Sequence, residues 1–277
     1  LTVSGSGDGY IGERVYEDGP GVFTFTVPAG IRAIHACAVG AGGHDTYDGG
    51  GGGGLAWANS IPVEPGEKLE VRAGQSLTSG SDLSHSGIYR AILDENGDPV
   101  LDQQDNPRYT MLLEGRGGES NNGGSFGAVA GVDSGGGEGG DGSLYYNNNV
   151  NSAFGSGAGA GGYDGAGGDG GGRAPAPNSG GASGGTQFFI TSGNMGGTQP
   201  GAVGGGVGIR GRGTTATAPP QQGSGESAKA GKPGSGGDGK EFGGGGHSGE
   251  MGGHGAVRII WGIRFSYPDN ADIEAVE

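Results

Sequence analysis

The distribution of glycine most constrains what this chain can fold into. Of its 75 glycines, 54 fall within residues 115–262 and none lies after residue 262. Glycine has no side chain to bury, and it loses more backbone entropy on folding than any other residue. The glycine-rich stretch therefore lacks the material for an aliphatic core. Any order in it must come from contacts between backbones.

Glycine recurs at every third position in two parts of this stretch, a period that matches the three residues per turn of polyproline II. The two series are Gly159, Gly162, Gly165, Gly168 and Gly171, and Gly243, Gly246, Gly249, Gly252 and Gly255. A glycine stripe leaves one face of such a helix bare, so that another helix can lie close against it. We therefore expect a hydrogen-bonded lattice of polyglycine II helices.

Two alternatives to this lattice follow from the same composition. Collagen would need long, uninterrupted glycine runs and abundant proline, whereas these runs are short and the chain has 13 prolines. Disorder is favoured by the composition alone, because a lone glycine strand gains too little to offset its ordering entropy. A scaffold that fixes the ends of the strands favours order, and the flanking sequence supplies one.

That flanking sequence consists of apolar runs separated by turn residues, which predict β-strands. The runs cover residues 22–27, 31–39, 55–63, 68–73, 88–93, 109–113 and 256–261. We expect a mainly β protein with almost no α-helix, built as a jelly-roll-like β-sandwich with an inserted lattice of polyglycine II helices. Residues 1–114 form its strand-rich part, residues 115–255 the insertion, and residues 256–277 the final strand and tail that complete the sandwich.

Several motifs carry a resemblance to a known group of proteins. They are VFTFTVPAG at 22–30, HACAVGAGG at 35–43, GGGGLAWANSIPVEPG at 51–66, GGGVGIRGRG at 204–213 and GAVRIIWG at 255–262. Together they resemble the glycine-rich tail-associated proteins of marine bacteriophages, cyanophages especially, over about residues 15–270. In plan the chain is similar to phage tip adhesins that pack polyglycine II strands. The order of strands and glycine runs is closer to the glycine-rich ectodomain of the anaplastic lymphoma kinase receptors.

The resemblance implies a phage virion structural protein, either a tail fibre or a tail-associated adhesin that presents loops to a host-surface receptor. It implies a place in the virion after assembly in the host cytoplasm. The partners would be other virion proteins, a host cell-surface glycan or protein, and further copies of the chain. The alternative is a purely structural virion component, such as a fibre joint, neck or capsid decoration, that binds no receptor. Neither function requires a cofactor or enzymatic activity.

Candidate receptor-binding residues interrupt the glycine period, because a glycine lattice must place large side chains at its ends or outer faces. They are Tyr145, Tyr146, Asn147, Asn148, Phe188, Phe189, Arg210 and Arg212. Exposed aromatic rings beside amides are suited to gripping a sugar or a protein surface. The alternative for the aromatic residues is packing on the sandwich or on a sister subunit. The two arginines resemble those of RNA-binding RGG segments, but salt bridges to neighbouring carboxylates or an end-loop role is favoured over RNA binding in a chain of this charge.

The net charge of −15 argues against nucleic-acid binding and against electrostatic attachment to anionic lipid. No apolar run is long enough for a membrane-spanning helix, so no membrane insertion is expected. The single Cys37 has no partner for an internal disulfide, which fits assembly in a reducing cytosol. No Ser/His/Asp arrangement is recognisable, and we expect no catalytic residues.

A calcium loop is the weak metal candidate. Asp94, Asn96 and Asp98 are spaced as the first oxygen ligands of such a loop, but Gly97 falls at position 4 rather than 6. Asn96-Gly97 is itself a hairpin-turn signal, and we favour a hairpin over calcium binding. The five histidines show no metal-ligand spacing, and the segment most similar to a phosphate loop, 225–233, has proline where Ser or Thr would bind magnesium.

Overall fold

The computed structural model describes residues 11–44, 48–77, 82–142, 157–169, 204, 206–211, 242–246, 251–262 and 265–271, together with the backbone of three short strands at 3–4, 146–147 and 152–153. Within these residues there is no α-helix, which confirms the expected mainly β fold. The calls on Gly171, Gly249, Tyr145, Asn148, Phe188, Phe189 and Arg212 lie outside the described residues.

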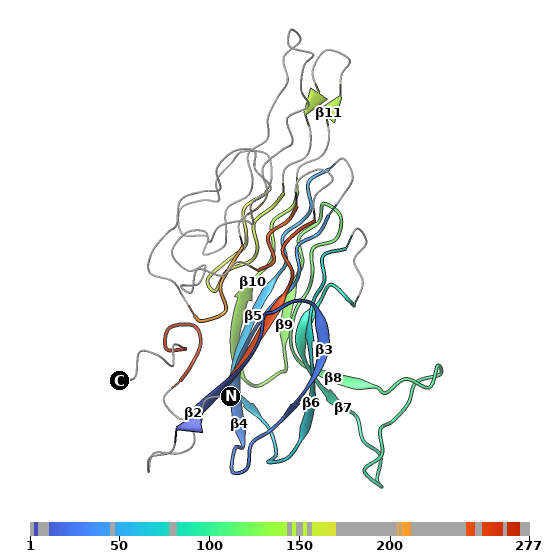
Figure 1. The fold of residues 1–277 in the computed structure, drawn as a ribbon, viewed down its shortest axis with the longest axis vertical. Coiled ribbons are helices and arrows are strands. Elements are labelled where there is room, and N and C mark those ends of the chain that lie inside the picture. Colours follow the sequence, from blue (N-terminus) through green and yellow to red (C-terminus); the bar gives the residue numbers. More distant parts are fainter. Residues whose placement is uncertain are drawn as a thin grey trace.

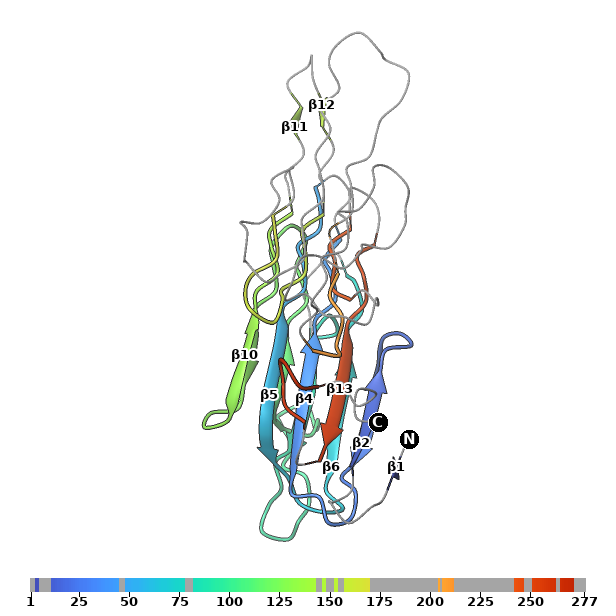
Figure 2. The ribbon, with the colours of Figure 1, turned by 90° about the vertical axis from the view of Figure 1, so that its left-hand side faces the viewer.

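Two antiparallel sheets make up the body of the protein (Figures 1 and 2). The six-stranded sheet has the order β1(Val3–Ser4), β2(Ile11–Tyr16), β13(Ala256–Trp261), β4(Ala33–Val39), β5(Leu55–Pro62), β10(Asp133–Gly137). The five-stranded sheet has the order β3(Gly21–Thr26), β6(Lys68–Ala73), β7(Ser86–Ala91), β8(Tyr109–Gly115), β9(Phe126–Ala128). A separate ladder pairs β11(Tyr146–Asn147) with β12(Ser152–Ala153).

Seven strands overlap the apolar runs of the sequence, and β6 and β13 coincide with theirs. Two further strands lie inside residues 115–255 and still belong to the sheets: β9 pairs with β8, and β10 pairs with β5. Extended glycine segments also occur before residue 115, at 40–43 and 49–54. The strands of the sandwich and the glycine segments are thus interleaved along the sequence.

The core between the two sheets is built by alternating side chains. In β13, Val257, Ile259 and Trp261 face the five-stranded sheet and meet residues such as Leu69 and Leu113. These side chains are almost completely buried. An alternating strand places every second side chain on this face, so the pattern of the sequence translates directly into the inner core.

The outer face of the six-stranded sheet is covered as well. Ala256 and Ile260 of β13 lie in a second cluster with Tyr163, Phe242 and Tyr267, which come from outside the sheet. Figure 2 shows the segment that carries Tyr267 lying across this face, in dark red. Because both faces are covered, all six residues of β13 are buried, and the strand is apolar along most of its length.

Glycine segments continue beyond one end of the sandwich and are hydrogen-bonded to one another through their backbones (Figure 1). Gly52 donates to the carbonyl of Gly140 at 2.9 Å and accepts from Gly124 at 2.8 Å. A Cβ atom built on Gly52 would lie 2.0 Å from the carbonyl oxygen of Gly159. The segments are therefore packed too closely for any side chain to fit between them.

The two period-three series do not run straight. Gly159 donates to Gly168 at 2.8 Å and Gly162 to Gly165 at 2.9 Å, so the first series pairs with itself across a turn. In the second series, Gly243 donates to the carbonyl of His254 at 3.2 Å. The described glycines of both series thus lie in backbone contacts between segments that reverse direction.

Candidate functional site

Of the candidate receptor-binding residues, Arg210 is the one whose side chain the structure describes. Its Nη1 lies 3.8 Å from Oε2 of Glu13, and 27% of the Arg210 side chain is exposed. Glu13 also accepts a 2.8 Å hydrogen bond from Nε of Arg258, a fully buried arginine of β13. This position matches the salt-bridge interpretation of Arg210 and places it against the outer face of the six-stranded sheet.

Tyr146 and Asn147 form β11, which pairs antiparallel with β12. Among the described elements, this short ladder lies farthest from the sandwich, with glycine segments between the two (Figures 1 and 2). The described element farthest from the sandwich thus carries an aromatic residue, Tyr146, and an amide residue, Asn147; we call this ladder the tip.

The calcium candidate is a turn that is closed by its own aspartate. Oδ1 of Asp94 accepts hydrogen bonds from the amides of Asn96 at 2.9 Å and Asp98 at 3.0 Å. These bonds lower the pKa of Asp94, with the amide of Asp98 the largest cause. Gly97 has a φ of 85° but Asn96 is not among the residues with positive φ, so the hairpin closes through a three-residue loop that ends at Gly97 rather than through a two-residue type I′ turn. Among the described residues no group of three or more acidic, His or Cys side chains is placed to hold a metal ion.

Eight residues later the same turn recurs. Asp102 accepts from the amides of Gln104 at 2.8 Å and Asn106 at 2.9 Å. The two turns form an exposed arm between β7 and β8, visible at the lower right of Figure 1. The arm explains why this stretch is charged: its aspartates satisfy backbone amides that have no partner strand.

A polar cluster fixes the segments that cover the six-stranded sheet. The Tyr163 hydroxyl donates to the carbonyl of Gly208 and accepts from the amide of Gly211, each at 3.1 Å. Nδ2 of Asn59 donates to the carbonyl of Tyr267 at 2.7 Å, and its Oδ1 accepts from the Tyr267 amide at 2.8 Å. Burial raises the pKa of Tyr163 well above 10 and keeps its hydroxyl protonated. Because these groups are enclosed and paired within the protein, the cluster is structural.

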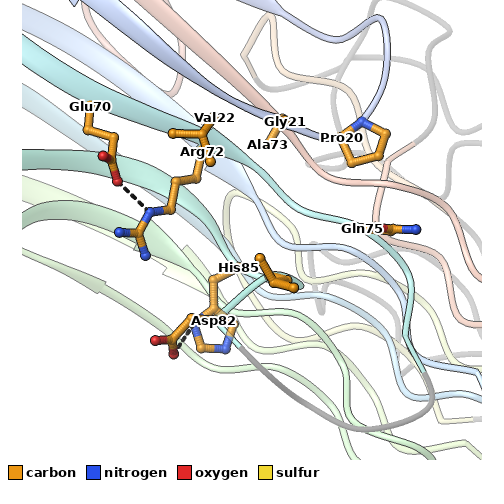
Figure 3. A pocket seen from close by; sticks show the side chains of 10 residues that line it. Pro20, Gly21, Val22, Glu70, Arg72, Ala73, Gln75, Asp82 and His85 are labelled. Carbon is orange, nitrogen blue, oxygen red and sulfur yellow. Dashed lines mark hydrogen bonds and ion pairs between the residues drawn. The ribbon is translucent and has the colours of Figure 1, made fainter. Parts of the chain in front are cut away.

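A recess of about 450 Å³ lies beside the five-stranded sheet (Figure 3). We call it the flank recess. It is formed by the start of β3, by β6 with the residues after it, and by the residues before β7. Its lining residues are Pro20, Gly21, Val22, Glu70, Arg72, Ala73, Gln75, Asp82, Leu83 and His85.

Arg72 is the best-anchored side chain in the flank recess. Its Nε donates to Oε1 of Glu70 at 2.7 Å, and its guanidinium lies over the ring of Tyr89 at 4.5 Å and that of Tyr109 at 5.7 Å. Burial acts to lower the pKa of Arg72, but the bond to Glu70 and nearby negative charge raise it, so Arg72 stays charged. Stacking and pairing together hold the guanidinium in one orientation.

His85 is held from behind by a buried carboxylate. Its Nδ1 lies 3.8 Å from Oε2 of Glu114 and 4.0 Å from Oδ1 of Asp82. Glu114 also accepts from the Tyr89 hydroxyl at 2.7 Å and from Nε of Arg116 at 2.8 Å. Burial acts to raise the pKa of Glu114, but these hydrogen bonds and the nearby cations lower it. Glu114 therefore stays ionised and orders this side of the flank recess.

Sequence reasoning did not identify the flank recess. The one signal was the alternation in residues 68–73, which puts Glu70 and Arg72 on the same face of a strand. The signal does not reveal that Asp82 and His85 lie beside that face, because they reach it through the connection from β6 to β7.

Comparison with protein families, with curated proteins and with solved structures finds no match to this chain. In the part of the chain that the structure describes, no helix has the length and apolar character needed to cross a membrane.

Proposed function

We propose that this chain is a structural protein of a phage virion, a tail fibre or tail-associated adhesin that presents a tip to a host-surface receptor. The observation that carries the proposal is the position of the β11–β12 ladder, at the far end of the molecule from the sandwich (Figure 1). Tyr146 and Asn147 lie in this ladder, so these two candidate contact residues would be among the first described residues to reach a surface, whereas Arg210 lies against the sandwich. The sequence motifs that resemble those of tail-associated phage proteins favour the same function.

The glycine segments would serve as a rigid spacer in such an adhesin. We propose that they form a polyglycine II lattice within a jelly-roll-like sandwich. Two observations support the lattice: successive segments exchange backbone hydrogen bonds, and a Cβ atom on Gly52 or Gly139 would lie 2.0 Å or less from a neighbouring carbonyl oxygen. Each segment is held by several neighbours, which gives stiffness without a side-chain core.

The sandwich would be the part that attaches to the rest of the particle. In this proposal its partners are other virion proteins and further copies of the chain, and the tip contacts a host-surface glycan or protein. Binding requires no cofactor and no reaction. The net charge of −15 supports contacts with proteins and neutral glycans over contacts with nucleic acid.

The test is an exchange of the tip. Residues 143–152 are replaced by a flexible Gly/Ser segment of equal length, and the purified chain is incubated with cells of candidate hosts. We expect loss of saturable cell binding with an unchanged unfolding midpoint. The matched control replaces residues 94–98, an exposed turn of the arm between β7 and β8, and is expected to keep cell binding.

Two results would overturn the proposal that the chain is an adhesin. Cell binding that survives the exchange would place the receptor site elsewhere on the chain. Absence of binding by the unaltered chain to every host that the parent phage infects would favour the purely structural component, such as a fibre joint or capsid decoration.

A further inference from the structure

The flank recess lies on the side of the sandwich, apart from the β11–β12 tip, and the proposed receptor contact makes no use of it. Its volume of about 450 Å³ falls within the range of about 300–1,000 Å³ that is usual for small-molecule sites. Val22 and Leu83 line it and are 63% and 67% exposed, so part of its wall is apolar and open to solvent.

The polar part of the lining offers both donors and acceptors. Arg72 can only donate, Glu70 and the highly exposed Asp82 accept, and the Gln75 amide does both. A ligand that matches this wall must itself carry several groups that donate and accept, and must also have an apolar face for Val22 and Leu83. A pyranose ring has both, since its hydroxyls donate and accept while its C–H groups form an apolar surface.

The charges of the lining select against anions. Two carboxylates, Glu70 and Asp82, face one permanent cation, Arg72, and that cation is already paired with Glu70 at 2.7 Å. An incoming carboxylate or phosphate would therefore meet net negative potential, whereas a neutral ligand would not.

The polar wall is organised before any ligand arrives. Arg72 is stacked on two tyrosine rings and paired with Glu70 at 2.7 Å. Side chains that are already ordered lose little conformational entropy when a ligand binds, so a smaller part of the binding free energy is lost.

We propose that the flank recess binds a neutral sugar ring, either free or as one residue of a glycan chain. Arg72, Glu70 and Asp82 hydrogen-bond the hydroxyls, and Val22 and Leu83 pack on the apolar face of the ring. The proposal does not depend on the adhesin function, because it concerns a different part of the molecule and a different measurement.

The experiment is a titration of the isotope-labelled full chain, followed by amide NMR. The probes are the methyl glycosides of glucose, galactose and mannose, with glucuronate as the anionic comparison and soluble dextran, galactan and mannan as the glycan-chain comparison. We expect saturable shifts for at least one neutral glycoside, centred on the amides of Val22, Arg72 and His85, and weaker binding of glucuronate. If the matching polysaccharide also binds, the source is a glycan chain; if the glycoside alone binds, it is a free sugar.

Two variants test the roles of the side chains. Arg72→Met keeps the length of the side chain but removes its donors, and we expect at least about a tenfold loss of affinity. Asp82→Asn alters a side chain that is 88% exposed and is expected to fold normally, so it remains informative if Arg72→Met fails to fold. Because the amide keeps one acceptor oxygen, we expect a smaller loss of about threefold or more. Arg32→Met, which removes an exposed arginine that does not line the flank recess, is the control and should leave affinity unchanged.

Three results would overturn the proposal: no saturable shift with any neutral glycoside, tighter binding of glucuronate than of the neutral glycosides, or shifts that lie elsewhere and are unaffected by Asp82→Asn. The chain with residues 143–152 replaced separates this site from the adhesin. Sugar binding that persists while cell binding is lost supports both proposals independently.

Discussion

Gly52→Ala tests whether the glycine segments are held together by backbone contact. Gly52 is buried, and a Cβ atom on it would lie 2.0 Å from the carbonyl oxygen of Gly159 and 2.5 Å from the carbonyl carbon. Ordinary contact begins at about 3.4 Å. The two segments must therefore separate by about 1.4 Å, and no flexible side chain is present to move instead.

This separation has a definite cost. Gly52 donates to Gly140, Gly140 donates to Gly159, and Gly124 donates to Gly52, at 2.8 to 2.9 Å. Moving either segment by about 1.4 Å breaks one or two of these bonds, each with a net value of about 0.5–1.5 kcal/mol. Overpacking adds about 1–3 kcal/mol. We expect a decrease of about 3–5 kcal/mol in the free energy of unfolding, which lowers the melting temperature by about 10 °C.

The measurement is urea unfolding and calorimetry of the full chain, with Gly127→Ala as the matched control. A Cβ atom on Gly127 would lie 3.4 Å from the terminal methyl of Met111, which can move. We expect the control to unfold within about 1 kcal/mol of the native chain. If Gly52→Ala is equally stable, the glycine segments are not close-packed and the reasoning fails.

Three further predictions concern the sandwich. Arg258→Ala removes a fully buried cation from its carboxylate partner, and urea unfolding should show a loss of about 3–5 kcal/mol. Folding lowers the pKa of Glu114, so ionised Glu114 stabilises the folded chain above its ordinary pKa of 4.5, and this contribution is lost as the pH falls through its pKa in the folded state. The difference in unfolding free energy between the native chain and Glu114→Gln should therefore shrink on acidification. Tyr163→Phe should cost about 1–3 kcal/mol and speed hydrogen exchange at the amide of Gly211.

Each of these predictions has a result that contradicts it. Arg32→Ala breaks an ion pair whose side chains are 74% and 76% exposed, and it should change stability by less than about 0.5 kcal/mol. A loss equal to that of Arg258→Ala would show that burial does not matter. A stability difference for Glu114→Gln that grows at low pH would reverse the assigned direction of its pKa. Unchanged exchange at Gly211 would mean that the Tyr163 hydroxyl does not hold that amide.

Several elements were accessible from local sequence pattern. Residues 68–73 and 256–261 became β6 and β13, because their apolar and β-branched residues suit a strand in any sheet context. The turn at Asn96-Gly97 was also predictable, since glycine readily adopts the positive φ that the turn needs. Both signals are local and need no knowledge of partners.

Other elements are strands only because of their neighbours. β10 has the sequence DSGGG and no apolar residue, yet it pairs residue by residue with β5 from Asp133↔Asn59 to Gly137↔Leu55. The sequence analysis missed β2 because Gly12 interrupts its apolar pattern. Glycine is needed there because a Cβ atom on Gly12 would lie 2.4 Å from the Trp261 ring of β13. In both cases the reason for the residue lies on another strand.

The flank recess was likewise beyond the reach of sequence, because its side chains come from three separate segments. No pattern in one segment indicates which side chains of another will face it. The pairing of Arg72 with Glu70 is local, but the approach of Asp82 and His85 depends on the path of the chain between β6 and β7.

The glycine content shows the same division. By itself the sequence determined that residues 115–255 have too few apolar side chains for a large aliphatic core, so that much of the order there must come from the backbone. It did not determine which segment lies beside which, because every glycine offers the same amide and the same carbonyl. The tertiary structure makes that choice. Several of the described glycine segments continue from strands of the sandwich, so strands that are neighbours bring the backbones of these glycine segments together.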